Sequence, residues 1–129
     1  MTTALTDAER IGAAQAYIDA LVSHDAGKVP FAPGCTRVEM GLKTGFSGNH
    51  LCRSLNRGLQ YRVIKSATVP EFTVAGEAVR ARFDLTTKPA LAGRRVGARI
   101  DETFIIRADT TGRAEIHRIR AGIRPFLTR

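Results

Sequence analysis

Apolar residues recur at helical spacing in the first part of the chain and alternate with polar residues in the second. The spacing of one helix face is seen in Ile11, Ala14, Ile18, Leu21 and Val22. Thr6 followed by Glu9 has the form of a capping box just before this stripe. The pattern therefore predicts an amphipathic helix over residues 7–24.

The segment after this helix is broken by proline and glycine. Pro30 and Pro33 indicate a connector over residues 27–34. A short strand is predicted over residues 36–40. The glycines that follow predict a flexible loop, after which Asn49 is a candidate cap for a second helix. That helix carries Leu51, Leu55 and Leu59.

From residue 61 onward the apolar period is two, which predicts strands. The strands are expected over residues 61–74, 77–87, 95–107 and 114–124. Turns are expected at residues 75–76, 88–89, 92–93 and 109–112. Short turns favour antiparallel neighbours. Helices followed by a long meander predict an α+β domain, with the helices covering one sheet face.

Length and composition favour one ordered domain spanning residues 1–129. No apolar run approaches the ~18 residues that a membrane span needs. The first ten residues have neither a basic leader nor an apolar stretch, so we expect a cytoplasmic protein that does not bind membranes. Cys35 and Cys52 have the number and spacing of neither a disulfide framework nor a zinc site.

The formal net charge of +8 raises the question of nucleic-acid binding. Sixteen of the twenty basic residues are arginine, they are scattered along the chain, and no aromatic residues interleave with them as a stacking platform. This distribution argues against a nucleic-acid partner and favours a solvated surface with internal ion pairs.

Glu102 interrupts the apolar face of its predicted strand. Every second residue from Val96 to Ile106 is apolar except this one, so the carboxyl group is expected to point with Ile100 and Phe104 toward the helices. A carboxylate among apolar side chains is costly to ionise. Three alternatives are open: an arginine such as Arg118 or Arg120 satisfies it, a bulge turns it outward, or it is kept protonated as a hydrogen-bond donor to a carbonyl oxygen.

Two further residues are candidates for the same chemistry. Glu39, between Val38 and Met40, is either an exposed strand residue or, if it faces the same cavity, a general base that moves a proton without a metal. Tyr17, at the edge of the first helical stripe, is either a core aromatic or a catalytic donor.

The order of elements resembles the nuclear transport factor two superfamily, which includes ketosteroid isomerase and SnoaL-like cyclases. The resemblance covers nearly the whole chain. The stretch from Ala14 to Leu21 resembles the first helix of ketosteroid isomerase and puts Tyr17 at its oxyanion-hole tyrosine. The segment from Cys35 to Glu39 puts Glu39 at its catalytic base, and the segment from Ile100 to Phe104 puts Glu102 at its protonated acid. A shift of one residue selects Asp101 instead.

The resemblance implies a cone-shaped α+β barrel, in which a curved antiparallel sheet is covered on its concave face by the N-terminal helices. It also implies a homodimer and a cofactor-independent isomerase or lyase. Such an enzyme moves a proton next to a carbonyl of a hydrophobic, steroid-like or polyketide-like substrate. The expected substrate-binding residues are Phe104, Ile100, Asp101, Arg82 and Asp84.

Two alternatives stay open. Arg82-Phe83-Asp84 resembles the Arg-x-Asp pair of limonene epoxide hydrolase, although no acidic residue follows Glu115 to serve as that family's second aspartate. The same fold also hosts binding and interaction modules without catalysis. No two histidines have ligand spacing on one element, so no metal site is expected. No dinucleotide-binding or nucleophile motif is present either.

Overall fold

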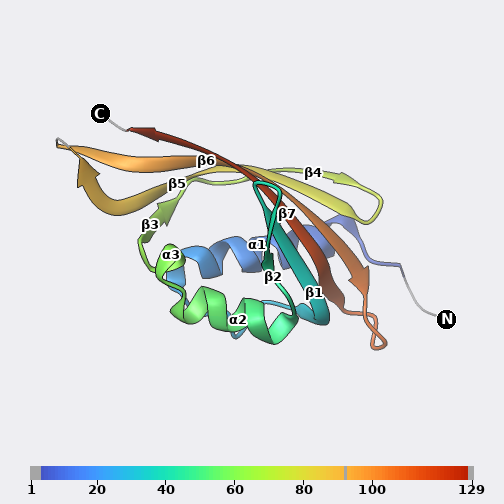
Figure 1. Ribbon diagram of the computed structural model, residues 1–129. Coiled ribbons are helices and arrows are strands. Elements are labelled where there is room, and N and C mark those ends of the chain that lie inside the picture. The colour runs from blue at the N-terminus through green and yellow to red at the C-terminus, as the bar shows by residue number, and fades with distance from the viewer. Residues whose placement is uncertain (1–3, 92, 128–129) are drawn as a thin grey trace.

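The computed structural model describes residues 4–91 and 93–127. Three helices lie on one side of a curved seven-stranded sheet that arches over them (Figure 1). The helices are α1 (Asp7–Ser23), α2 (Gly48–Arg57) and the single turn α3 (Leu59–Arg62). The strands are β1 (Phe31–Glu39), β2 (Leu42–Gly45), β3 (Ile64–Ala67), β4 (Glu71–Ala75), β5 (Ala78–Leu91), β6 (Arg94–Ala108) and β7 (Ala114–Leu127).

The predicted α+β class is confirmed, but the sheet differs from the expectation in two respects. It is mixed, because β1 runs parallel to β7 while the other pairs are antiparallel. It is also open, with the strand order β2-β1-β7-β6-β5-β3 and with β4 on β5.

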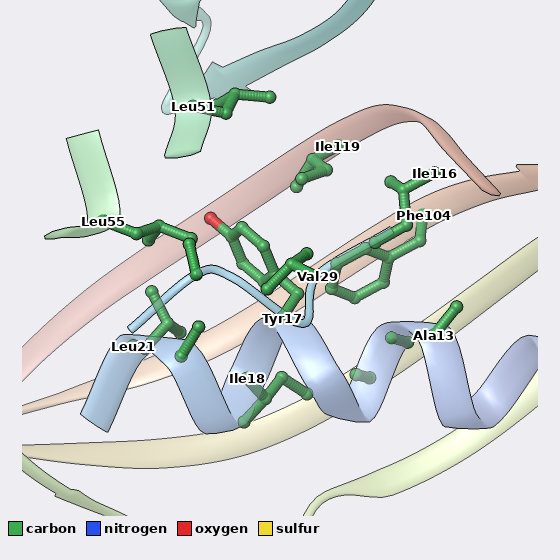
Figure 2. Packing of buried hydrophobic residues seen from close by; sticks show 14 of the residues in the cluster. Ala13, Tyr17, Ile18, Leu21, Val29, Leu51, Leu55, Phe104, Ile116 and Ile119 are labelled. Atoms are coloured by element: carbon green, nitrogen blue, oxygen red, sulfur yellow. The ribbon is translucent and has the colours of Figure 1, made fainter. Parts of the chain in front are cut away.

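The first helix forms as its sequence predicts. The Thr6 side chain accepts a hydrogen bond from the Glu9 amide at 3.1 Å, and the Glu9 carboxylate accepts one from the Thr6 amide at 3.0 Å. This reciprocal pair satisfies amide groups that the first helical turn leaves free. The helix buries its apolar stripe under the sheet, and Figure 2 shows Ile18, Tyr17 and Leu21 on the packed side.

The second helix begins earlier than expected. Ser47, rather than Asn49, is the N-cap, and its hydroxyl accepts a hydrogen bond from the His50 amide at 3.1 Å. Part of the predicted glycine loop forms β2, and part of the predicted connector is the start of β1. The apolar side chains of Leu51 and Leu55 are buried, as the spacing predicts (Figure 2).

The single strand predicted over residues 61–74 is divided, since this segment forms the end of α3 and then two strands, β3 and β4. Pro70 explains the break between the two strands, because proline has no amide hydrogen for a sheet ladder. The predicted turn at residues 88–89 is also wrong, because β5 continues to Leu91. Its pairing with β6 shifts register between Thr86 and Ala90, and this irregularity accommodates Pro89.

Candidate functional site

A cavity of about 270 Å³ lies between the helices and the concave face of the sheet. Tyr17 from α1, Glu39 from the end of β1, Tyr61 from α3 and Glu102 from β6 supply its main polar groups. The rest of the wall is mostly apolar and includes Leu21, Ile64, Leu85, Ile100, Ala121 and Ile123. The cavity is therefore an apolar pocket toward which two carboxyl groups and two phenol groups point.

Sheet register brings the two carboxyl groups together. Ala121 on β7 is paired with Glu39 on one side and with Glu102 on the other. Cross-strand partners point to the same face, and neighbouring strands lie about 4.8 Å apart. Ala81 on β5 is the other partner of Glu102. Small side chains thus flank Glu102 on both sides and leave space around its carboxyl group.

Glu102 is only 3% exposed. Among the described residues, none forms a hydrogen bond or an ion pair with its carboxyl group. Burial raises the pKa of Glu102 to about 8, the nearby Glu39 adds to the increase, and Arg37 opposes it. At neutral pH the group is therefore a protonated acid that can donate a hydrogen bond into the cavity.

The two arginines considered as partners of Glu102 do not reach it. Arg118 and Arg120 are exposed, on the outward-facing positions of β7. The strand alternation that sends Ala121 into the cavity sends its neighbour Arg120 to the other face of the sheet. Neither Arg118 nor Arg120 therefore forms the structural ion pair that could have explained Glu102.

Glu39 has a different environment from Glu102. Its carboxylate accepts hydrogen bonds from the Tyr61 hydroxyl group at 2.8 Å and 2.9 Å. Its side chain forms an ion pair with Arg37, at 3.6 Å between Nε and Oε1, and is 18% exposed. The pocket thus holds one paired carboxylate and one unpaired, buried carboxyl group, which is the division expected of a base and an acid.

Tyr17 is buried under the sheet, where its ring packs edge-on against Phe104 with the centroids 5.4 Å apart. Its hydroxyl oxygen accepts a hydrogen bond from Arg37 Nη1 at 3.2 Å. Burial raises the pKa of Tyr17 well above its usual range, and Glu102 adds to this effect, so the hydroxyl group keeps its proton. Figure 2 shows the ring rising from α1 with its oxygen toward the side of Leu55.

The remaining predicted binding residues are distributed over both faces of the sheet. Ile100 lines the cavity. Phe104 is buried beside Tyr17 but outside the lining. Asp101, Arg82 and Asp84 lie on the opposite face, where Asp101 pairs with Arg80 and Arg82, and Asp84 pairs with Arg99. Of the two competing acids, Glu102 rather than Asp101 faces the pocket.

This placement also affects the hydrolase alternative. The Arg82-Phe83-Asp84 segment directs only its phenylalanine inward, and both charged side chains take part in exposed pairs. The residues on which the resemblance to the epoxide hydrolase rested are therefore on the wrong side of the sheet for the cavity.

Sequence reasoning missed two members of the site, Arg37 and Tyr61. Arg37 shares the inward parity of β1 with Cys35 and Glu39, so two charged residues stand in succession on one buried face. The i, i+2 spacing of Arg37 and Glu39 is a sequence signal that both charged side chains point to the same face of the strand. Tyr61 was assigned to a strand, and no local pattern places its hydroxyl group on Glu39.

Several other features bear on the kinds of site that the chain can form. None of the described helices is long and apolar enough to cross a membrane. Within residues 4–91 and 93–127, no cluster of three or more histidine, cysteine, aspartate or glutamate side chains could hold a metal ion. Cys35 and Cys52 are free thiols.

Comparisons with known proteins agree with this architecture. A family described as "Domain of unknown function (DUF8021)" matches residues 3–123. No curated protein gives a significant match.

Solved structures give many matches to the fold. A ketosteroid isomerase-like protein from Erwinia carotovora atroseptica SCRI1043 is 17% identical with a TM-score of 0.62, over 90% of this chain and 94% of that one. An LEH-like epoxide hydrolase of M. tuberculosis is 18% identical with a TM-score of 0.67, over 91% and 84%. The epoxide hydrolase/cyclase-like enzyme SalBIII is 12% identical with a TM-score of 0.69, over 92% of each chain. The chain therefore has the fold of ketosteroid isomerase-like and epoxide hydrolase-like structures, as the resemblance predicted.

Proposed function

The chain belongs to the DUF8021 family, and on the geometry of its pocket we propose that it binds a small hydrophobic carbonyl compound and moves a proton next to the carbonyl group. One observation carries this proposal. A single apolar cavity brings together a paired carboxylate, Glu39, and two protonated donors, Tyr17 and Glu102.

The proposed reaction needs no group from outside the pocket. In a β,γ-unsaturated ketone, Glu39 takes a proton from the carbon between the carbonyl group and the double bond, and the C–H electron pair shifts to give a dienolate with negative charge on the carbonyl oxygen. Tyr17 and Glu102 donate hydrogen bonds to that oxygen as its charge develops. Glu39 then returns the proton at the γ-carbon of the dienolate, so the net change is the movement of a double bond.

Cavity size narrows the substrate class. An engineered protein cavity of about 150 Å³ holds one benzene molecule. At about 270 Å³, this pocket suits a compound with one ring or two small rings. A four-ring steroid would have to extend beyond the cavity, so we favour small cyclic or polyketide-derived enones over intact steroids.

A deuterium wash-in experiment tests the proposal. The protein is incubated in D₂O with 3-cyclohexen-1-one, whose isomerisation to the conjugated enone is followed by ultraviolet absorbance and whose deuterium content is read by mass spectrometry. We expect turnover with the wild type and with Asp101→Asn, which changes the opposite face, and loss of turnover with Glu39→Gln. If Glu39→Gln isomerises the enone as fast as the wild type, Glu39 is not the base.

The non-catalytic alternative rests on the same pocket. A module that only binds ligand would retain 2-cyclohexen-1-one, measured by ligand-observed NMR, without exchanging its protons for deuterium. Binding without exchange in both wild type and Glu39→Gln would favour this alternative over the isomerase.

The expected homodimer and cytoplasmic location remain part of the proposal. The free thiols Cys35 and Cys52 fit a reducing compartment. Sedimentation equilibrium over a range of protein concentrations would test the dimer, and a single species at monomer mass would contradict it.

A further inference from the structure

Arg37 is the most deeply buried charged residue of the described chain. Its side chain is 0% exposed, although it stands on β1 only two residues before the cavity residue Glu39. A buried guanidinium group is costly unless its donors are satisfied and its charge is compensated. The contacts of the Arg37 guanidinium group therefore indicate the role of its charge.

Part of the environment holds the guanidinium group in place. Nε donates to the Thr44 hydroxyl group at 3.0 Å, and Nη2 donates to the Thr44 carbonyl at 3.1 Å and to the Ser54 hydroxyl group at 3.1 Å. The group also lies 4.8 Å from the centre of the Tyr61 ring. These contacts come from β2, α2 and α3, and they leave the planar fork little freedom to turn.

The other contacts are with the cavity residues. Nη1 donates to the Tyr17 hydroxyl oxygen at 3.2 Å, and Nε lies 3.6 Å from Glu39 Oε1. A residue needed only for folding would not have to meet both the candidate donor and the candidate base. Arg37 contacts both, yet it does not itself line the cavity.

The hydrogen bond to Tyr17 has a direction that matters. A guanidinium group has no acceptor, so the Tyr17 oxygen must accept this hydrogen bond. The proton of the Tyr17 hydroxyl group is then left for another partner. Among the described residues, no acceptor takes that proton. Because Tyr17 lines the cavity, a ligand oxygen is the partner that the geometry leaves for it.

We propose that Arg37 is a positioning residue, which acts through Tyr17 to make its hydroxyl group a polarised donor for an oxygen anion in the cavity. A hydroxyl group that accepts a hydrogen bond from a cation is a stronger donor, because each bond polarises the next. The inference rests on the proposed function, since it assigns to the same pocket a preference for ligands with negative charge on oxygen.

The test uses two ligands of matched size, 4-nitrophenol and 4-nitrotoluene. Near neutral pH 4-nitrophenol is partly ionised, and only its anion absorbs visible light, so absorbance reports the bound form directly. We expect the wild type to bind 4-nitrophenolate more tightly than 4-nitrotoluene. Arg37→Met should weaken phenolate binding by about tenfold, as expected for one charge-assisted hydrogen bond, and change 4-nitrotoluene binding by less than about twofold.

A double-mutant cycle shows whether Arg37 acts through Tyr17. Tyr17→Phe alone should cost about as much phenolate affinity as Arg37→Met, and combining the two should cost no more than either alone. Additive losses would mean that Arg37 does not work through Tyr17, and unchanged phenolate affinity in a folded Arg37→Met variant would overturn the proposal.

The buried site requires a folding control. Circular dichroism and urea unfolding are measured first, with Arg80→Met on the outer face as the matched control. If Arg37→Met does not fold, Arg37→Lys keeps the charge but loses the fork, and the same cycle with Tyr17→Phe is measured on it. A wild type that does not prefer phenolate to nitrotoluene would contradict this inference. A preference for phenolate without enone isomerisation would contradict only the proposed reaction.

Discussion

Glu39 and Glu102 lie in one row of the sheet, on strands separated only by β7, and face the same cavity. The residue between them is Ala121, which pairs with both. A larger side chain at this position would fill the space over which the two carboxyl groups converge. The pairing of these three residues therefore sets the separation of the two carboxyl groups, and the small side chain of Ala121 leaves space for a ligand between them.

Ala121→Leu tests that relationship. The added atoms enter a space that is empty, so we expect a folded protein whose urea midpoint is close to that of the wild type. Affinity for 4-nitrophenol should fall by more than about tenfold, measured by the absorbance titration. Ala75→Leu, at an exposed position of β4, is the control and should bind as the wild type does. Unchanged affinity in Ala121→Leu would place the ligand elsewhere.

Glu102 gives the protein a specific pH dependence. Its pKa is raised from 4.5 to about 8, so between these values the folded state keeps a proton that the unfolded state has lost. The unfolded state then binds fewer protons, and stability falls as pH rises, by up to about 1.4 kcal/mol per pH unit. Below pH 4.5 both states are protonated and the effect is absent, and above pH 8 it is complete.

Glu102→Gln should remove this component of the pH dependence, because the amide does not titrate. Urea unfolding of the wild type and the variant at several pH values between 4 and 9 gives the difference in free energy. We expect the unfolding free energy of the wild type to fall relative to that of the variant as pH increases. A difference that stays constant over this range would mean that Glu102 ionises normally in the folded protein.

Asp101 is the natural comparison for Glu102 because it is the next residue toward the N-terminus and faces the other way. The hydrogen bond from Arg80 lowers the pKa of Asp101, and the pair is exposed. Exposed ion pairs contribute about 0–1 kcal/mol. Asp101→Asn should therefore change the unfolding free energy by less than about 1 kcal/mol and leave 4-nitrophenol binding unchanged. Loss of binding in Asp101→Asn would reverse the assignment of the two acids.

Gly45 is a structural requirement of the site at some distance from the chemistry. A Cβ atom there would lie 2.3 Å from Leu51 Cδ2 and 2.9 Å from Arg37 Cβ. Gly45→Ala should cost about 1–3 kcal/mol of unfolding free energy, since β2 must move away from its neighbours. Gly12→Ala, in α1, meets nothing within 4 Å and should stabilise the protein by about 0.5–1 kcal/mol. The two substitutions should therefore change the unfolding free energy in opposite directions. A pair of urea titrations would distinguish the effect of close packing at Gly45 from that of helix propensity at Gly12.

Local sequence patterns are sufficient to predict features that depend on a single helix or strand. The capping box at Thr6 and Glu9 fixed the start of α1, and the alternation of β6 fixed which way Glu102 points. Both depend on residues a few positions apart. The same rule of alternation would have turned Arg37 inward, had it been applied to β1 as well.

Other features depend on distant segments and had no local signal. Tyr61 donates to Glu39 only because the folded chain brings its hydroxyl group within hydrogen-bond distance of the end of β1. The parallel pairing of β1 with β7 is equally invisible in an alternating pattern, which is the same for parallel and antiparallel neighbours. The break between β3 and β4 is different, because Pro70 is a local signal for it.

The parallel pairing of β1 with β7 also bears on the time course of folding. Arg37 is the partner of Ile119, so the strand carrying the base is held by a strand that follows it by about 80 residues in the sequence. Contacts between such distant segments close large loops and form slowly. The row formed by Glu39, Ala121 and Glu102 is therefore completed only when β7 pairs with both β1 and β6, late in the folding of this domain.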